Sequence, residues 1–218
     1  MKYRENQNIV VYSFFRLLFA MIFKLLFHIK AYCRWRIPKR GGIIIASNHQ
    51  SYIDPPAVGS CVFHRPFFFM ARDNIFDIPV LGRFIVWLGA FPIKRGKFDL
   101  AGMNLMISLL KKGKAVVMFP EGTRSWNGDL LPLQPGIGII AHKAQVPILP
   151  VYIEGFYKAW PRHNLFPRFL RPVRVIYGDP IDLYDLYSKK PSGEIYREIT
   201  RRVEEKIFQL REEIKHYH

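Results

Sequence analysis

The sequence predicts an α/β domain whose central, largely parallel sheet is flanked by helices. Short apolar runs of strand length alternate with segments of helical periodicity, as buried parallel strands and their crossover helices require. Of the 218 residues, 50% are hydrophobic and 15% are aromatic, which excludes a disordered chain. The 15 glycines and 16 prolines are spread along the chain, which excludes a fibrous repeat.

The expected elements follow one another along residues 36–218. Continuous apolar runs predict strands at 43–47, 66–70, 90–93, 115–119, 147–153 and 172–177. Apolar residues that recur at three or four positions predict helices at 55–63, 79–88, 98–112, 136–144 and 193–216. The turn-rich segment 36–42 separates this domain from residues 1–35, which we expect to form an N-terminal membrane-docking helix and a basic linker.

The apolar segment 9–29 has nearly the length of a membrane span. Arg16 and Lys24 interrupt it, and each would cost roughly 2.5–3.5 kcal/mol at the centre of a bilayer. On a helical wheel the polar side chains occupy about half of the circumference. This pattern predicts an amphipathic helix that lies in the headgroup layer, with its apolar side down and its cations up. A spanning or re-entrant helix, and a helix docked on the protein's own core, are the alternatives.

The balance of charge indicates an anionic partner. The chain carries 33 Lys and Arg against 17 Asp and Glu, a formal net charge of +16, which suits nucleic acid, a lipid surface, a phosphorylated substrate or an acidic carrier protein. Cations are dense in the first forty residues, and each is worth about 1 kcal/mol near an anionic leaflet. Two cysteines cannot build a disulfide framework, and the seven histidines show no metal-ligand spacing.

The segment 48–54, Asn-His-Gln-Ser-Tyr-Ile-Asp, follows the first strand of the domain, where open α/β sheets place ligands. On a helix His49 and Asp54 would lie about 140° apart, but Pro55 disfavours helix at Asp54. A loop that brings Asp54 to Nδ1 of His49 would fix the tautomer of the ring and raise its basicity. The alternatives are a plain N-cap at Asp54 and an ordinary hydrogen-bonded histidine.

The sequence shows no nucleophile motif beside this pair, which favours an enzyme that activates a substrate hydroxyl directly. Two further segments carry polar residues at strand ends. Residues 119–125 include Gly122, which gives backbone freedom, and Arg124, whose fork suits phosphate or carboxylate. Residues 89–95 end in two cations. Taken alone, each segment could equally be a polar turn or a solvated face.

Together, the motifs NHQSYID, GAFPIKR, FPEGTRS and VPILPV resemble in sequence and order those of the glycerolipid acyltransferase family, and within it the bacterial 1-acyl-glycerol-3-phosphate acyltransferases. The resemblance covers roughly residues 36–180. The second motif departs from the family, because Pro92-Ile93 stands where Phe-Ile is common. The resemblance implies a glycerol-3-phosphate acyltransferase-like fold. It also implies transfer of a fatty acyl group from a thioester to the sn-2 hydroxyl of 1-acyl-sn-glycerol-3-phosphate, which makes phosphatidic acid.

The resemblance also implies roles for individual residues. His49 would be the general base toward the acceptor hydroxyl, and Asp54 would orient it. Arg72, where many relatives have a lysine, would have a supporting role. The implied substrate contacts are Arg95 and Arg124 for the phosphate, and Glu121, Gly122 and Thr123 for the glycerol site.

The family's acyl donor is a thioester of coenzyme A or acyl carrier protein, and no metal or bound cofactor is implied. We therefore expect a membrane phospholipid surface, lysophosphatidic acid and the acyl donor as partners, at the cytoplasmic face of a membrane. Nucleic acid is not expected, because no nucleic-acid motif occurs. Two alternatives stay open. One is the same chemistry on glycerol-3-phosphate, another lysophospholipid or a lyso-aminolipid, and the other is a non-enzymatic basic protein that binds membranes or nucleic acid.

Overall fold

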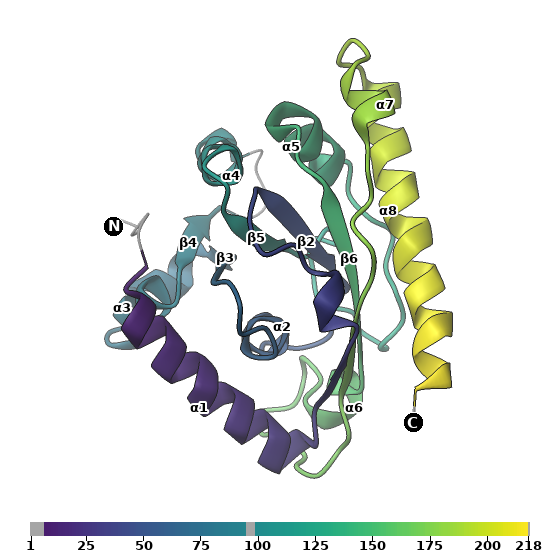
Figure 1. Cartoon of the computed structure of the whole chain (residues 1–218). Helices are drawn as coiled ribbons and strands as arrows, with labels where there is room; N and C mark the ends of the chain where they lie inside the picture. Colours follow the sequence, from purple (N-terminus) through teal and green to yellow (C-terminus); the bar gives the residue numbers. More distant parts are fainter. Residues whose placement is uncertain (1–6, 95–98, 218) are drawn as a thin grey trace.

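The computed structural model describes residues 7–94 and 99–217 and confirms the predicted fold class (Figure 1). The strands are β1 (Lys30–Tyr32), β2 (Ile43–Ser47), β3 (Phe67–Arg72), β4 (Ala90–Ile93), β5 (Ala115–Met118), β6 (Ile148–Glu154) and β7 (Arg174–Tyr177). They form one sheet in the order β1-β7-β6-β2-β5-β3-β4. Neighbouring strands are parallel except β6 and β7, which are antiparallel.

Helices connect most of these strands. The α-helices are α1 (Ile9–Phe27), α2 (Asp54–Ser60), α3 (Leu81–Trp87), α4 (Leu100–Lys111), α5 (Gly136–Ala144), α6 (Phe156–Ala159), α7 (Tyr184–Tyr187) and α8 (Gly193–Glu213). Short 3₁₀ turns cover Arg34–Arg36, Asp73–Asp77 and Ile214–His216. The predicted helix 193–216 is thus α8 followed by a tighter final turn.

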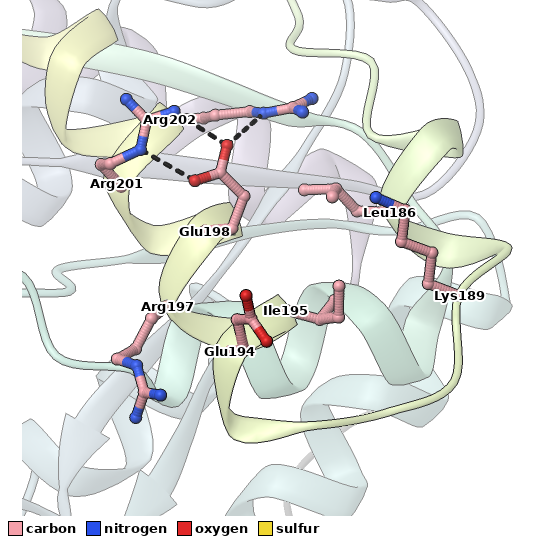
Figure 2. A pocket seen from close by; sticks show the side chains of 8 residues that line it. All are labelled: Leu186, Lys189, Glu194, Ile195, Arg197, Glu198, Arg201 and Arg202. Carbon is pink, nitrogen blue, oxygen red and sulfur yellow. Dashed lines mark hydrogen bonds and ion pairs between the residues drawn. The ribbon is translucent and has the colours of Figure 1, made fainter.

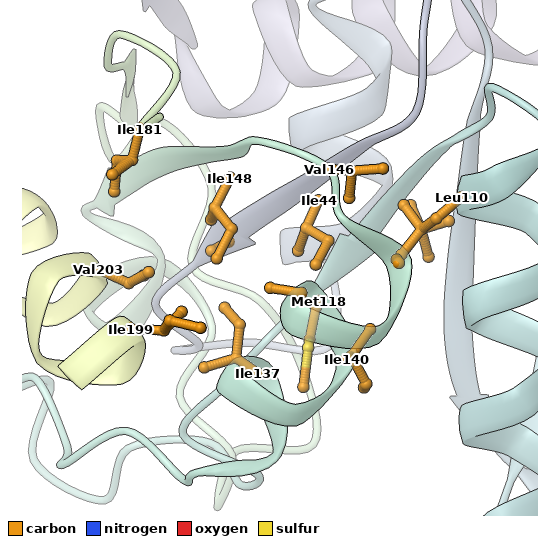
Figure 3. Close-up of a cluster of buried hydrophobic side chains, with 14 of the residues drawn as sticks. Ile44, Leu110, Met118, Ile137, Ile140, Val146, Ile148, Ile181, Ile199 and Val203 are labelled. Atoms are coloured by element: carbon orange, nitrogen blue, oxygen red, sulfur yellow. The ribbon is translucent and has the colours of Figure 1, made fainter. Parts of the chain in front are cut away.

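The helices cover both faces of the sheet and give three layers (Figure 1). On one face α4, α5 and α8 pack against residues such as Ile44 and Ile148 (Figure 3). On the other face α1, α2 and α6 pack against residues such as Ile45 and Leu149. Successive residues of a strand point to opposite faces, and here both faces are covered, so every residue of β2 is buried. This is why the strands read as continuous apolar runs.

The sequence pattern does not predict β1, α6 and α7, which have only three or four residues each. Segments of this length hold too few residues for a period to show. The domain boundary at residue 36 stays a prediction. On its N-terminal side, β1 pairs with β7 and extends the sheet.

Helix α1 has an inner face that packs on the domain. Tyr12 and Phe23 are buried there, and the ring of Phe15 lies 4.7 Å from that of Phe84 in α3. Arg16 also turns toward the domain, where its guanidinium donates to the carbonyl of Phe63 at 3.0 Å. On this face, α1 therefore matches the alternative of a helix docked on the protein's own core.

The opposite face of α1 is apolar and exposed. We call it the α1 outer stripe, and it consists of Val10, Phe14, Leu17, Met21 and Leu25. By length and composition α1 could cross a membrane, with a mean hydropathy of 2.1, and it is the one such helix in residues 7–94 and 99–217. Since the stripe lies opposite the docked face, the helix can pack on the domain and anchor to a membrane at the same time.

Candidate active site

The loop between β2 and α2 holds His49 against Asp54. Nδ1 of His49 lies 2.7 Å from Oδ2 of Asp54, which is the contact that the sequence predicts. The same oxygen accepts the backbone N–H groups of Gln50 at 2.6 Å and Ser51 at 2.7 Å. Because a carboxylate only accepts, Nδ1 of His49 carries the proton and Nε2 is left as a proton acceptor.

Asp54 is fully buried and is the first residue of α2, with Pro55 in the first turn. The N–H groups that its carboxylate accepts precede the helix, so the plain N-cap alternative is wrong. Three donors converge on one oxygen, and this curls the loop tightly enough to bridge the 140° that a helix would impose.

The imidazole of His49 is fixed on a second side. Its ring stacks on Phe119 with centroids 4.2 Å apart and planes inclined by 24°. Asp54 therefore holds one edge of the ring, and Phe119, just after β5, covers one face. The side chain keeps 14% exposure, so the ring is oriented by the protein but not sealed from solvent.

The turn 119–125 is tied directly to this loop. The N–H of Ser125 donates to the carbonyl of His49 at 2.8 Å, and the N–H of Gly122 donates to the carbonyl of Phe119 at 3.0 Å. Gly122 has φ of +72°, and an added Cβ would meet only Gln134, at 3.6 Å. Backbone conformation, not lack of space, therefore requires glycine at this position.

Arg124 is a buried cation in the same turn. It is 8% exposed, and its guanidinium lies 3.4 Å from the centroid of the Tyr52 ring. Its Nη1 is buried and has no hydrogen-bond partner within residues 7–94 and 99–217. Burying a charge is costly unless it is paired, so this guanidinium is suited to an anion that the protein itself does not supply.

Glu121 is 4% exposed, and its Oε2 has no hydrogen-bond partner in the described part of the chain. Burial raises the pKa of this carboxyl to about 8, and the nearby charge of Asp54 adds to the effect, while the backbone N–H groups of His49 and Leu131 oppose it. The group is therefore mostly neutral at pH 7 and can donate a hydrogen bond as well as accept one.

The structure brings most of the predicted site residues into two adjoining turns. The members of this group are His49, Asp54, Glu121, Gly122, Thr123 and Arg124. Arg95 lies outside the described residues. Arg72 is exposed at the end of β3.

Sequence reasoning missed several residues that hold the two turns. The side-chain amide of Asn48 donates to the carbonyl of Ile153 in β6 at 2.9 Å and accepts its N–H at 2.7 Å. Gln50 donates to the carbonyl of Gly128 at 3.1 Å and accepts the N–H of Tyr157 at 3.2 Å. Both residues flank His49 in the first motif, and a polar side chain beside a candidate catalytic residue is the signal that could have found them.

Arg162 is a further basic residue that the sequence does not connect with the site. Its Nη1 donates to the backbone carbonyl of Arg124 at 3.2 Å, and its guanidinium lies 3.4 Å from the centroid of the Trp126 ring. Arg162 follows α6 and lies outside the motifs that contain the other site residues. The sequence therefore gives no local signal for it.

A groove of about 510 Å³ lies between α7 and α8 (Figure 2). It contains several cations, but Glu198 forms ion pairs with both Arg201 and Arg202. None of the predicted site residues lines it. Within residues 7–94 and 99–217, no group of three His, Cys, Asp or Glu side chains is placed to hold a metal ion.

Residues 28–154 match the model of the Acyltransferase family, and the chain belongs to this family. Among curated proteins it is similar to the 1-acyl-sn-glycerol-3-phosphate acyltransferase of Bacillus subtilis (strain 168), with 27% identity over 84% of this chain and 87% of that protein. It is also similar to the chloroplastic 1-acyl-sn-glycerol-3-phosphate acyltransferase BAT2 of Brassica napus, with 35% identity over 63% of this chain. This chain spans 40% of the length of the Brassica protein.

Among solved structures, the chain is similar to the 1-acyl-sn-glycerophosphate (LPA) acyltransferase PlsC from Thermotoga maritima. The TM-score is 0.74 at 28% identity, and the match covers 96% of this chain and 80% of that one. The likeness to this α/β structure therefore extends over nearly the whole chain, beyond the residues that carry the motifs.

Proposed function

We propose that this protein transfers a fatty acyl group from an acyl thioester to the sn-2 hydroxyl of 1-acyl-sn-glycerol-3-phosphate and so makes phosphatidic acid. The names of its relatives support this reaction. The observation that carries the proposal is the His49–Asp54 pair, tied through Ser125 to the turn of Arg124, whose buried Nη1 has no hydrogen-bond partner in the described residues. A base and an anion grip in adjoining turns suit an acceptor with a hydroxyl at one point and a phosphate at another.

In the proposed reaction, Nε2 of His49 takes the proton of the sn-2 hydroxyl as its oxygen attacks the thioester carbonyl carbon. Asp54, on the other side of the ring, stabilises the imidazolium that forms. The tetrahedral intermediate then collapses, the C–S bond breaks, and the thiolate leaves and receives the proton from His49. A thiol with a pKa near 8.5 is a good leaving group, so the transfer needs no acyl-enzyme.

Arg124 is proposed to bind the phosphate of the acceptor, with Arg95 as a second contact. A guanidinium can offer two parallel N–H donors to phosphate oxygens, and holding the phosphate brings the hydroxyl to His49 in a fixed register. Glu121, Gly122 and Thr123 would shape the glycerol site between them. The neutral carboxyl of Glu121 avoids the repulsion that a carboxylate would exert on the phosphate.

Both the acceptor and the product are lipids, and we propose that α1 holds the enzyme on the cytoplasmic face of a membrane. The α1 outer stripe supplies the apolar contact. The donors, coenzyme A or acyl carrier protein thioesters, are water-soluble carriers and would approach from the cytoplasm. No bound cofactor is needed for this chemistry, because the thioester already carries an activated acyl group.

The reaction is tested with the full-length protein in detergent, lysophosphatidic acid and either donor, by following release of the free thiol and formation of phosphatidic acid. Replacement of the base by His49→Ala should lower turnover by about 10²–10⁴-fold. His216→Ala, at an exposed histidine after α8, is the matched control and should retain turnover. Acyl transfer by His49→Ala at the wild-type rate would remove the residue as base, and transfer only to another acceptor would correct the substrate.

A further inference from the structure

The loop 161–172, between α6 and β7, exposes a cluster of large apolar side chains. Its members and their exposures are Leu165 (80%), Phe166 (75%), Phe169 (52%) and Leu170 (66%). Four such side chains within six residues are far from the scattered apolar exposure that a soluble surface normally shows. The loop therefore needs a partner.

Contacts with α1 hold the C-terminal end of this loop in place. The N–H of Leu170 donates to the carbonyl of Leu26 at 2.7 Å, and the rings of Phe169 and Phe27 lie 6.0 Å apart. Leu170 has φ of +59°, a conformation that a leucine rarely adopts. A strained residue that leaves its apolar side chain in solvent persists only where its surroundings fix it. Figure 1 shows the segment that leads into β7 beside the C-terminal end of α1.

The charge of the loop points to an anionic partner. Arg168 and Arg171 are exposed, and residues 155–178 contain no Asp or Glu. Apolar side chains interleaved with cations fit a leaflet of anionic phospholipid, in which hydrocarbon lies beneath negative headgroups. An acidic protein partner would satisfy the cations, but it would not by itself account for the adjoining α1 outer stripe.

The loop also begins at the candidate active site. Arg162 donates to the carbonyl of Arg124. Just before it, the carbonyl of Trp160 accepts the hydroxyl of Ser51 at 2.8 Å. The same segment thus contacts both turns of the site at its start and α1 at its end. A membrane that binds this loop would therefore also fix the distance between the candidate active site and the membrane surface.

We propose that the loop 161–172 is a second lipid-inserting element, which forms with the α1 outer stripe one continuous surface that docks on an anionic phospholipid leaflet. Leu165 and Phe166 enter the apolar boundary, and Arg168 and Arg171 contact the headgroups. This inference deepens the proposed function, because it places the site where a lipid acceptor lies. Its readout is membrane binding without any acyl donor, so it can fail separately from the proposed reaction.

The first test measures binding of the full-length protein to phosphatidylcholine vesicles with and without phosphatidylglycerol. The Leu165→Ser/Phe166→Ser variant should bind about tenfold more weakly to both, because apolar area no longer leaves water. Arg168→Glu/Arg171→Glu should bind about tenfold more weakly to the anionic vesicles only. The matched controls, Tyr184→Ser on α7 and Lys189→Glu/Lys190→Glu beyond it, alter equally exposed residues and should bind as wild type.

The second test measures insertion directly. Both native cysteines are buried, so an environment-sensitive fluorophore can be placed selectively on Phe166→Cys or, as control, on Tyr184→Cys. The probe at 166 should shift to the blue on addition of anionic vesicles and be quenched by spin-labelled acyl chains, whereas the probe at 184 should do neither. If the probe at 166 stays in water while the protein sediments with the vesicles, α1 docks alone and the proposal is wrong.

Two other outcomes would also overturn it. Wild-type binding by both loop variants would show that the loop does not contact lipid. Conversion of a wild-type dimer to a monomer by Leu165→Ser/Phe166→Ser, without a change in vesicle binding, would assign the surface to a second copy of the chain. Urea unfolding of each variant, matched to wild type, excludes misfolding as the cause of weaker binding.

Discussion

The two turns of the candidate active site and the surface formed by the α1 outer stripe and the loop 161–172 depart from ordinary protein structure in opposite ways. In the turns, ionisable side chains are buried, as Asp54, Glu121 and Arg124 show. On the surface, large apolar side chains are exposed, such as Phe14 and Phe166. Buried polar groups and exposed apolar patches are the informative exceptions to the usual partition between core and surface.

The difference shows what each region lacks. A buried guanidinium that is not paired with a carboxylate is suited to an anion, and an exposed apolar patch is suited to an apolar surface. Both chemistries occur in one lysophospholipid, which has a phosphate at one end and an acyl chain at the other. If the two regions serve these separate purposes, a substitution in one of them should leave the function of the other unaffected.

The largest expected effect comes from Asp54→Asn. The amide can still accept an N–H with its oxygen, but it presents an NH₂ group to Nδ1 of His49, which favours the tautomer with the proton on Nε2. A general base without a free acceptor cannot take the hydroxyl proton, so turnover should fall by about 10²–10⁴-fold. Steady-state kinetics check this, and vesicle binding should be unchanged. Turnover near the wild-type value would show that Asp54 does not set the tautomer.

Arg124→Ala should act mainly on the acceptor. Loss of a charge-assisted hydrogen bond costs about 1.5–3 kcal/mol, so the KM for lysophosphatidic acid should rise about tenfold to a hundredfold while the KM for the acyl donor stays constant. Arg124→Lys keeps the charge but loses the planar fork. Its KM for lysophosphatidic acid should therefore lie between those of the wild type and Arg124→Ala. Equal rises in both KM values would mean that the residue supports the fold of the turn and does not grip the phosphate.

Much of the fold could be predicted from sequence, because a sheet buried on both faces leaves a strong local signal. Residues 43–47 are all apolar or small, and all are buried between two helical layers. The antiparallel pairing of β7 with β6 and the parallel addition of β1 have no such signal. These pairings are set by long-range contacts, and three or four residues carry too little pattern to show them.

The candidate site also has features that the local sequence indicates and features that only the tertiary structure shows. The short segment and Pro55 allowed the contact of His49 with Asp54 but left its alternatives open, and the family resemblance favoured the contact that the structure shows. The stacking of Arg124 on Tyr52 could not be predicted, because the two residues come from different turns that only the sheet brings together. The pKa of Glu121 was equally hidden, because it depends on burial, which a sequence of seven residues does not reveal.

Glu121→Gln tests the buried carboxyl of the site through the stability of the fold. The pKa of Glu121 is raised to about 8 in the folded protein from a usual value of 4.5. Between these two pH values the unfolded carboxyl is charged and the folded one is neutral. This group therefore stabilises the fold fully below pH 4.5, and its contribution is lost as pH rises toward 8, at up to roughly 1.4 kcal/mol per pH unit.

Glutamine is neutral at every pH, so Glu121→Gln should flatten the fall in the free energy of unfolding across this range. Urea unfolding in detergent at several pH values between 4.5 and 8 measures the slope. Glu194→Gln, at an exposed glutamate in the first turn of α8, is the control and should keep the wild-type slope. Parallel pH curves for Glu121→Gln and wild type would show that Glu121 is charged in the folded site.

The smallest expected effect tests the outer region alone. Met21→Ser removes one apolar side chain from the α1 outer stripe, where Met21 is 50% exposed, and Phe208→Ser removes one from α8, where Phe208 is 46% exposed. Burial of a whole methionine side chain is worth about 1.5–3 kcal/mol. A half-exposed methionine can add only part of this free energy, so binding of Met21→Ser to anionic vesicles should weaken several-fold.

Turnover in detergent should stay at the wild-type value for both variants, because both residues lie outside the two turns of the site. If Phe208→Ser weakened vesicle binding as much as Met21→Ser, exposure alone would explain the loss, and the α1 outer stripe would have no special role in docking.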